Sequence, residues 1–269
     1  MPKVTTEKKR WIGMNFEFDT RLVTQYRRGS QRIRVMSERW VEDSVFCPRC
    51  GNPRIKKLDN NRPVADFQCD GCGEIFELKS KKGRIGNKIA DGAYSTMIER
   101  ITSATNPDLF VLSYSEQLSV TNMFVIPKFL FVPLIIERRK PLGKNARRAG
   151  WVGCNIIIQD IPSQGRIDII KNQRMLNIDD VVQMYRHIEK LQTNNIENRG
   201  WLFDVLSCVN KIPSADFTLG EVYAYVEVLQ QKYISNHNVE AKIRQQLQVL
   251  RDKGFIEFVE RGRYRKIML

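Results

Sequence analysis

One stretch between residues 63 and 80 sets the architecture of this 269-residue chain: Pro63-Val-Ala-Asp66-Phe-Gln-Cys69-Asp-Gly-Cys72-Gly-Glu-Ile-Phe-Glu77-Leu-Lys79-Ser80. Residues 64–68 and 74–79, on either side of the two cysteines, read as short strands joined by a tight turn. Glu77 and Lys79 are two residues apart, so a strand projects both side chains from one face. If the turn reverses the chain, Asp66 lies nearly opposite Glu77 across the hairpin.

Four of the six cysteines form two close pairs with 18 residues between them, Cys47-Pro-Arg-Cys50 and Cys69-Asp-Gly-Cys72. This spacing predicts a structural Zn²⁺ site, because two thiolates on each tight turn can complete one tetrahedral shell. Four unrelated thiols or two disulfides are the alternatives, and disulfides are disfavoured in a chain without a secretion signal. Cys154 and Cys208 lie among apolar residues and are expected to be buried.

The zinc ion would clamp a hairpin that carries two carboxylates and a lysine. Asp66 and Glu77 suit a hard divalent cation, Mg²⁺ first among them, which binds a phosphate oxygen and stabilises the charge that develops there. Lys79 is expected to orient or help deprotonate the attacking water and to favour the transition state. An ordinary salt bridge on a surface hairpin is the alternative, since this spacing is common by chance.

The charge of the chain favours the catalytic interpretation. Lys and Arg number 44 against 30 for Asp and Glu, a formal net charge of +14, which points to a polyanionic partner such as nucleic acid. Residues 1–195 carry +12 of this surplus. The polar segment 192–198 reads as a linker. We therefore predict two domains, 1–195 and 196–269.

Helix and strand signals alternate in the larger part, which predicts an α/β or α+β fold. Helices are expected at 31–43, 89–102 and 178–191, and further strands at 109–113, 122–126 and 155–159. The smaller part predicts a winged helix-turn-helix, with a capping box at Thr218–Glu221. Its helices are expected at 200–212, from Thr218 to about residue 233 and at 239–253, and its hairpin strands at 255–259 and 263–267.

The longest apolar run, 129–136, is far too short to span a bilayer. The N-terminal MPKVTTEKKRW lacks the apolar stretch of a secretory signal. We therefore expect a cytoplasmic protein of a prokaryotic type, without a membrane partner. No obligate protein partner is evident, and a monomer is favoured.

Longer strings extend the pattern beyond the hairpin. They are Asn60–Phe67, Phe76–Gly83, Asp91–Tyr94, Arg147–Asn155 and Lys242–Lys253. Together with Pro63, Asp66 and Glu77-Leu-Lys79, these strings resemble the DpnI-like, methyl-directed (type IIM) restriction endonucleases of the PD-(D/E)xK nuclease superfamily. The similarity begins near Asn15 and covers nearly the whole chain, so the first dozen residues look like an extension.

The resemblance implies a magnesium-dependent enzyme that cleaves double-stranded DNA at GATC sites carrying N6-methyladenine. It implies that Asp66 and Glu77 ligate Mg²⁺ and that Lys79 is the catalytic lysine. It also implies the four-cysteine zinc site and a winged helix that itself reads methylated DNA.

Clusters of Lys and Arg indicate the path of the DNA, because phosphate contacts dominate affinity. Lys81 and Lys82 continue the catalytic strand, and Arg147 and Arg148 precede Trp151 on a predicted loop. Trp151 is a candidate for the apolar contact to the adenine methyl group, and a core tryptophan is the alternative.

The third helix of the small domain is expected to enter the major groove, where each base pair presents a distinct pattern. Its candidate base-reading side chains are Lys242, Arg244, Gln245 and Gln246. Arg263 on the wing is expected to contact phosphates or the minor groove.

Three other hypotheses explain part of the pattern. A zinc-containing winged-helix regulator without catalysis accounts for the charge and the cysteines but leaves the carboxylates and lysine idle. A histidine-metal nuclease is set aside because His187 and His237, the only histidines, lie far from the cysteines in sequence. A PD-(D/E)xK nuclease with another target keeps the mechanism and changes only the recognition.

Overall fold

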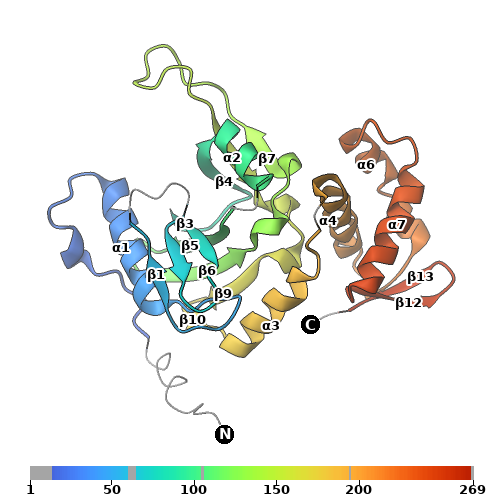
Figure 1. Ribbon diagram of the computed structural model, residues 1–269, viewed down its shortest axis with the longest axis horizontal. Helices are drawn as coiled ribbons and strands as arrows, with labels where there is room; N and C mark the ends of the chain where they lie inside the picture. Colours follow the sequence, from blue (N-terminus) through green and yellow to red (C-terminus); the bar gives the residue numbers. More distant parts are fainter. Residues whose placement is uncertain (1–13, 60–64, 104–105, 194, 268–269) are drawn as a thin grey trace, which may run out of the picture. The chain divides into compact units, whose positions relative to one another are not determined.

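The structure, a computed structural model, describes residues 14–59, 65–103, 106–193 and 195–267. The chain forms two compact units that both mix helices and strands (Figure 1), which confirms the predicted α/β class. The first unit contains residues 1–89, 103–128 and 166–186, and the second contains residues 90–102, 129–165 and 187–269. The domain boundary at residues 195 and 196 stays a prediction, and Pro63 lies outside the described residues.

A seven-stranded sheet forms the centre of the first unit, with the strand order β1-β2-β3-β5-β6-β9-β10. Its strands are β1 (Ile55–Lys57), β2 (Phe67–Cys69), β3 (Ile75–Lys82), β5 (Asp108–Tyr114), β6 (Val120–Ile126), β9 (Ile167–Lys171) and β10 (Arg174–Met175). Only the β3–β5 pair is parallel among these neighbours. Every residue of β5 is buried, as expected for a strand in the middle of a covered sheet.

Two helices pack on this sheet, α1 (Gly29–Ser44) and α3 (Ile178–Glu189). In α1, Met36, Trp40 and Val41 recur at helical spacing and are buried. Tyr185 of α3 donates a hydrogen bond to Asp108 of β5 at 2.7 Å. A short 3-10 helix, η2 (Thr20–Val23), precedes α1. The helices predicted at 31–43 and 178–191 are thereby confirmed.

The second unit begins with a three-stranded sheet of order β4-β8-β7. Its elements are β4 (Lys88–Ala93), α2 (Tyr94–Ile101), η3 (Lys128–Leu130), η4 (Pro133–Ile135), β7 (Ile136–Arg138), β8 (Gly153–Ile157), η5 (Ile158–Asp160) and η6 (Ser163–Gly165). The helix predicted at 89–102 is wrong over its first five residues, which belong to β4. Asp91 and Gly92 are poor helix formers, and pairing within the sheet takes up the backbone there.

The C-terminal part of this unit contains four helices and a second three-stranded sheet, of order β11-β13-β12. Its elements are α4 (Ile196–Lys211), β11 (Asp216–Thr218), α5 (Leu219–Tyr223), α6 (Val226–Lys232), α7 (Val239–Asp252), β12 (Ile256–Glu260) and β13 (Arg263–Lys266). The β12–β13 hairpin is the predicted wing. The capping box is confirmed, because the Thr218 N–H donates to Glu221 at 2.7 Å and the Glu221 N–H donates to Thr218 Oγ1 at 3.3 Å.

The helix predicted from Thr218 to about residue 233 is broken into α5 and α6. Tyr225 has a non-helical backbone at φ −98° and ψ 5°, between the two segments. The break lies in a run of β-branched and aromatic residues, which have lower helix propensity.

No helix in the described part of the chain is long and apolar enough to cross a membrane.

Candidate active site and zinc site

The four cysteines of the two CxxC pairs converge on one point. Their Sγ atoms all lie within 4.8 Å of one another. The Cys47–Cys72 distance is 3.7 Å and the Cys50–Cys69 distance is 3.6 Å. Sulfurs bound tetrahedrally at about 2.3 Å from zinc are about 3.8 Å apart, so the donor set fits Zn²⁺. Cys154 and Cys208, by contrast, are buried elsewhere, as predicted.

The two cysteine turns have the same backbone design. Gly51 donates its N–H to Cys47 at 2.8 Å, and Gly73 donates to Cys69 at 2.9 Å. Both glycines adopt a left-handed conformation, with φ of 78° and 73°. Glycine enters this region without the steric cost that a Cβ atom imposes, which explains the CxxCG pattern of both turns.

The second cysteine turn reverses the chain and aligns the predicted catalytic residues. The β2–β3 register pairs Phe67 with Phe76 and Gln68 with Ile75. The next step of the same register places Asp66 opposite Glu77, and the Asp66 N–H donates to the Phe76 carbonyl at 2.8 Å. The predicted proximity of Asp66 and Glu77 is therefore confirmed.

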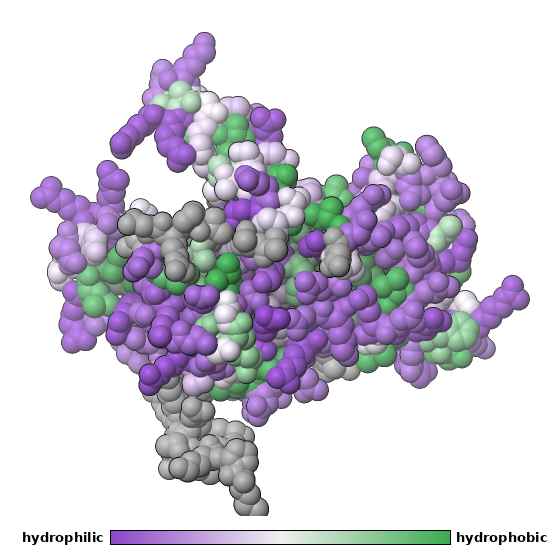
Figure 2. Space-filling view, in the orientation of Figure 1, coloured by the Kyte–Doolittle hydropathy of each residue, from purple (hydrophilic) through white to green (hydrophobic). Residues whose placement is uncertain are grey.

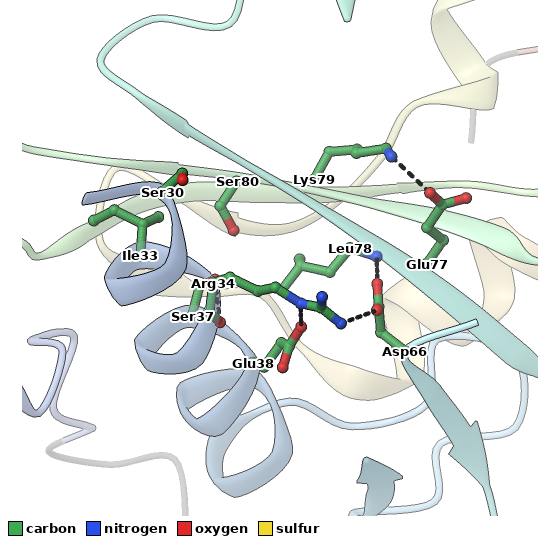
Figure 3. Close-up of a pocket in the computed structure, with 10 residues that line it drawn as sticks. All are labelled: Ser30, Ile33, Arg34, Ser37, Glu38, Asp66, Glu77, Leu78, Lys79 and Ser80. Carbon is green, nitrogen blue, oxygen red and sulfur yellow. Dashed lines mark hydrogen bonds and ion pairs between the residues drawn. The ribbon is translucent and has the colours of Figure 1, made fainter. Parts of the chain in front are cut away.

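Asp66, Glu77 and Lys79 line a single cavity of about 380 Å³ (Figure 3). Lys79 Nζ lies 2.6 Å from Glu77 Oε1. Asp66 accepts a hydrogen bond from the Leu78 N–H at 2.7 Å, at the edge of the strand. In the view of Figure 3, the Lys79–Glu77 pair lies on one side of β3 and Asp66 on the other.

Helix α1 forms the other wall of this cavity, which was not predicted. Ser30, Ile33, Arg34, Ser37 and Glu38 line it from one helical face. The spacing i, i+3, i+4, i+7, i+8 is the available sequence signal, but these residues are mostly polar and do not stand out as an apolar stripe. Only the packing of α1 against the sheet shows that this polar face meets the hairpin.

Arg34 and Glu38 form a charge network with Asp66. The Arg34 guanidinium pairs with Glu38 at 2.5 Å and lies 3.8 Å from Asp66. The Glu38 side chain is only 4% exposed, and Lys57 of β1 pairs with it at 2.7 Å. Glu38, fixed from both sides, therefore fixes the position of Arg34 in the cavity.

The electrostatics of the cavity raise the pKa of Asp66 above the usual value for an aspartate. Burial is the main cause, and the negative charge of Glu38 acts in the same direction. The Leu78 N–H, Arg34 and Lys79 act in the opposite direction by stabilising the carboxylate. A cation bound beside Asp66 would offset the cost of ionising this buried carboxylate. The carboxylate donors of Asp66 and Glu77 therefore fit a divalent metal ion.

A buried polar network joins the zinc hairpin to the sheet. The Glu74 side chain is 2% exposed and pairs with Lys128 at 2.6 Å and with Arg49 at 3.1 Å. Asp108, fully buried, accepts from the Lys128 N–H at 2.8 Å and from Tyr185 at 2.7 Å. Burial beside Glu74 raises the pKa of Asp108 to about 7.

The predicted DNA-contacting residues of the larger domain are exposed, apart from the tryptophan. Lys81 and Lys82 lie at the end of β3, and Lys82 pairs with Glu116 at 2.8 Å. Arg147 and Arg148 lie on the long loop between β7 and β8, which is mostly hydrophilic in Figure 2.

Trp151 is half-buried at the end of this loop, with the Arg148 guanidinium 4.6 Å from the centre of its ring. Its indole lies against Gly153, where a Cβ atom would come within 2.8 Å of the ring. One face of the indole is therefore covered by Arg148, and another part rests on the start of β8.

The predicted base-reading residues of α7 differ in accessibility. Arg244 and Gln245 are exposed, and Lys242 is half-buried and donates to Asn198 at 2.9 Å. Gln246, however, is only 3% exposed, so α7 turns it toward the packed side with Ile243 and Leu247. We therefore leave Gln246 out of the proposed DNA-reading set.

On the wing, Arg263 is exposed and pairs with Glu260 at 3.2 Å. It lies on β13, and its 65% exposed side chain is accessible to a partner. Pairing with one exposed carboxylate contributes little free energy, so a phosphate can compete for this guanidinium.

Comparison with known protein families agrees with the geometry. A model of the Dam-replacing family, DpnI, matches residues 14–194. A model of the Dam-replacing helix-turn-helix domain matches residues 197–266, the part of the chain that contains α7 and the wing. The two matches leave only residues 195 and 196 between them. The chain therefore belongs to the Dam-replacing (DpnI) family, whose members are methylation-dependent restriction endonucleases that act on DNA.

Proposed function

We propose that this protein cleaves double-stranded DNA at GATC sites that carry N6-methyladenine, by magnesium-dependent hydrolysis of a phosphodiester. The observation that carries the catalytic part is the common cavity of Asp66, Glu77 and Lys79 on a hairpin that the second cysteine turn closes. The GATC target and the methyl group come from the family resemblance. A zinc-containing regulator would have no use for this cavity.

Asp66 and Glu77 are the residues that would hold Mg²⁺. Both are carboxylates with side chains about one-fifth exposed, at 21% and 19%, so they remain accessible from the cavity. When bound, the ion supplies Lewis-acid stabilisation of the negative charge that develops on the phosphate oxygens. The four thiolates would hold Zn²⁺ as a structural ion, because a closed shell of four sulfurs has no open position.

Lys79 is the residue proposed to act on water and phosphate. Its ammonium lies in the same cavity as both carboxylates and is only 26% exposed, so its charge is weakly screened. Positioned beside the scissile phosphate, it would orient the attacking water and stabilise the charge of the transition state. Glu77, its present partner, would keep the ammonium at that position.

Recognition is proposed to involve both matched parts of the chain. In α7, Lys242, Arg244 and Gln245 would contact the major groove, and Arg263 would contact the backbone from the wing. Lys81, Lys82, Arg147 and Arg148 would contact phosphates in the nuclease part. Nothing in this arrangement requires a second copy, and we propose that a monomer binds the DNA.

Plasmid digestion tests the proposed activity directly. Plasmid DNA from a host that methylates adenine in GATC should be cut in Mg²⁺, and the same plasmid from a non-methylating host should stay intact. Asp66→Ala should abolish cutting and leave DNA binding largely unchanged. Cutting of both plasmids would show another target, cutting by Asp66→Ala would remove Asp66 from the mechanism, and two intact plasmids would favour a regulator.

Trp151 provides a separate test of methyl recognition. The N6-methyl group offers no hydrogen bond, so an apolar contact must sense it, and Trp151→Ala should reduce the preference for methylated over plain GATC. Arg148→Ala is the matched variant, because it uncovers the indole without removing it. Unchanged preference in Trp151→Ala, measured as the ratio of cleavage rates on the two plasmids, would contradict this role.

A further inference from the structure

The segment that leads into α1 has a concentrated positive charge. Residues 20–37 contain five arginines and no Asp or Glu. The first of them, Arg21, is neutralised by Asp19, whose carboxylate lies 2.8 Å away. The other four are all exposed: Arg27, Arg28, Arg32 and Arg34. We call these four the arginine segment.

A run of basic residues is normally a solvated surface, but this run ends inside the catalytic cavity. Arg34 lines that cavity together with Asp66 and Lys79. Its position is set by Glu38, which is nearly inaccessible to solvent, while the Arg34 side chain is itself 57% exposed. The guanidinium is therefore held in place at one edge and open to a ligand at the other.

The remaining arginines extend outward from this point. Arg28 and Arg32 are four residues apart at the start of α1, about one helical turn or 6 Å along the axis. Arg32 and Arg34 are two residues apart and project from different sides of α1, so the guanidinium groups surround the N-terminal half of the helix and reach the carboxylates through Arg34.

Arg39, near the other end of the same helix, is an exposed arginine whose charge is paired by carboxylates of the helix itself. Arg39 is as exposed as Arg34, at 56%, but it pairs with Asp43 at 2.7 Å and with Glu42 at 3.6 Å. Its charge is balanced within α1. Arg34 also has a partner within α1, Glu38, but Arg27, Arg28 and Arg32 have no Asp or Glu within four residues along the chain. The imbalance is therefore confined to the end of the helix near the cavity.

We infer that the arginine segment binds the DNA backbone on either side of the scissile bond, with Arg34 contacting the phosphate nearest the cavity. This inference rests on the proposed function, because it assumes that a phosphodiester is cut beside Asp66 and Glu77. Guanidinium groups suit the task because they stay charged and bind phosphate through two parallel hydrogen bonds. Arg27, Arg28 and Arg32 contact the flanking phosphates and set the register of the duplex in the cavity.

The salt dependence of DNA binding tests this inference. Full-length wild type, Arg28→Gln/Arg32→Gln and the charge-matched control Arg39→Gln/Arg174→Gln are titrated with a fluorescent duplex containing methylated GATC. Ca²⁺ replaces Mg²⁺, because it takes the same oxygen ligands, and gels check that the DNA stays intact. Each lost phosphate contact lowers the slope of log K against log salt by about 0.9, so the double variant should lose about 2 and the control nothing.

Single-turnover cleavage of methylated plasmid in Mg²⁺ provides the second readout. The double variant should need more protein for half-maximal rate than the control, with the same maximal rate, because it loses binding and no catalytic group. Arg34→Gln should also lower the salt slope, by about 1, and Arg34→Lys should restore part of it.

The outcomes separate this inference from the proposed function. If wild type cuts methylated plasmid but the double variant matches the control in both slope and half-saturation, the arginine segment does not bind DNA. If wild type does not cut but the double variant still loses slope, the segment binds DNA and the proposed cleavage is wrong. A slope loss as large in the control as in the double variant would mean that net charge, not position, is responsible, and would overturn the inference.

Discussion

At the scale of single residues, the position of Asp66 carries an electrostatic cost. Its carboxylate is largely withdrawn from water and lies near the negative charge of Glu38, and both effects raise its pKa. The ionised form is what a metal needs, yet burial disfavours that form in the metal-free protein. The positive charges of Arg34 and Lys79 offset part of this cost by stabilising the ionised carboxylate.

Asp66→Asn should stabilise the metal-free protein at neutral pH. The folded-state pKa of Asp66 is raised, so the folded protein binds more protons than the unfolded chain just above pH 3.8, the ordinary value. The favourable contribution of the protonated form is complete below that value and is lost as pH rises through the folded pKa. Wild type should therefore lose stability relative to Asp66→Asn as pH rises from 3.8 through the raised folded pKa.

Urea unfolding of both proteins across this range, without added divalent cations, measures the difference. The gap between the two midpoints should widen with pH and should shrink again when Mg²⁺ is added to wild type. A gap that stays constant with pH would mean that the pKa of Asp66 is not raised.

At the scale of elements, the hairpin of β2 and β3 is held at the end that contains its turn. The cysteine turns fix the end near Cys69 and Cys72, and the network around Glu74 ties it to the sheet. Two carboxylates at full burial, Glu74 and Asp108, are costly unless each is paired. Lys128 contacts both carboxylates: its ammonium pairs with Glu74, and its backbone N–H donates to Asp108.

Lys128→Met should destabilise the fold by about 2 kcal/mol. Removing one partner of a buried pair costs about 3–5 kcal/mol, and the loss is smaller here because Arg49 still pairs with Glu74. Lys56→Met is the matched control: Lys56 pairs with Asp70 at 2.8 Å, but both side chains are exposed, at 69% and 47%. Its loss should cost well under 1 kcal/mol.

Chemical unfolding with zinc held constant compares the two variants. Equal stability of Lys128→Met and Lys56→Met would show that Glu74 does not depend on Lys128.

At the scale of the whole molecule, the proposed function places DNA reading and catalysis in different parts of the chain. The exposed polar residues of α7 belong to the matched helix-turn-helix domain, and Lys79 belongs to the part matched by the Dam-replacing family model. Variants in the two parts should therefore change different kinetic constants.

Arg244→Ala/Gln245→Ala should raise the protein concentration needed for half-maximal single-turnover cleavage and leave the maximal rate unchanged. Each lost base contact should cost about 1–3 kcal/mol of discrimination. Lys79→Met should do the reverse, lowering the maximal rate by at least 100-fold, because removing a group that stabilises the transition state costs about 10²–10³.

Gln231→Ala, an exposed glutamine on α6, is the control and should resemble wild type. If the α7 variant lowered the maximal rate as well, recognition by the helix-turn-helix domain would be required for the chemical step itself.

Spacing along the chain was enough to predict the cysteine site, the reversal of the hairpin and the adjacency of Asp66 and Glu77. These features depend on a few neighbouring residues, since a tight turn and the two-residue period of a strand determine where such side chains project. The capping box at Thr218 was predictable for the same reason, because both of its partners lie within one helical turn.

Only the tertiary structure showed the remaining features, because each depends on which face of an element is covered. Glu38 and Arg34 reach the cavity from a helix that begins 37 residues before Asp66, Gln246 is buried beside Ile243, and the start of the segment predicted as a helix pairs into a sheet as β4. Packing selects one face of a helix for burial, and sheet pairing overrides a weak local preference. Contacts between distant segments therefore determined the second wall of the candidate active site.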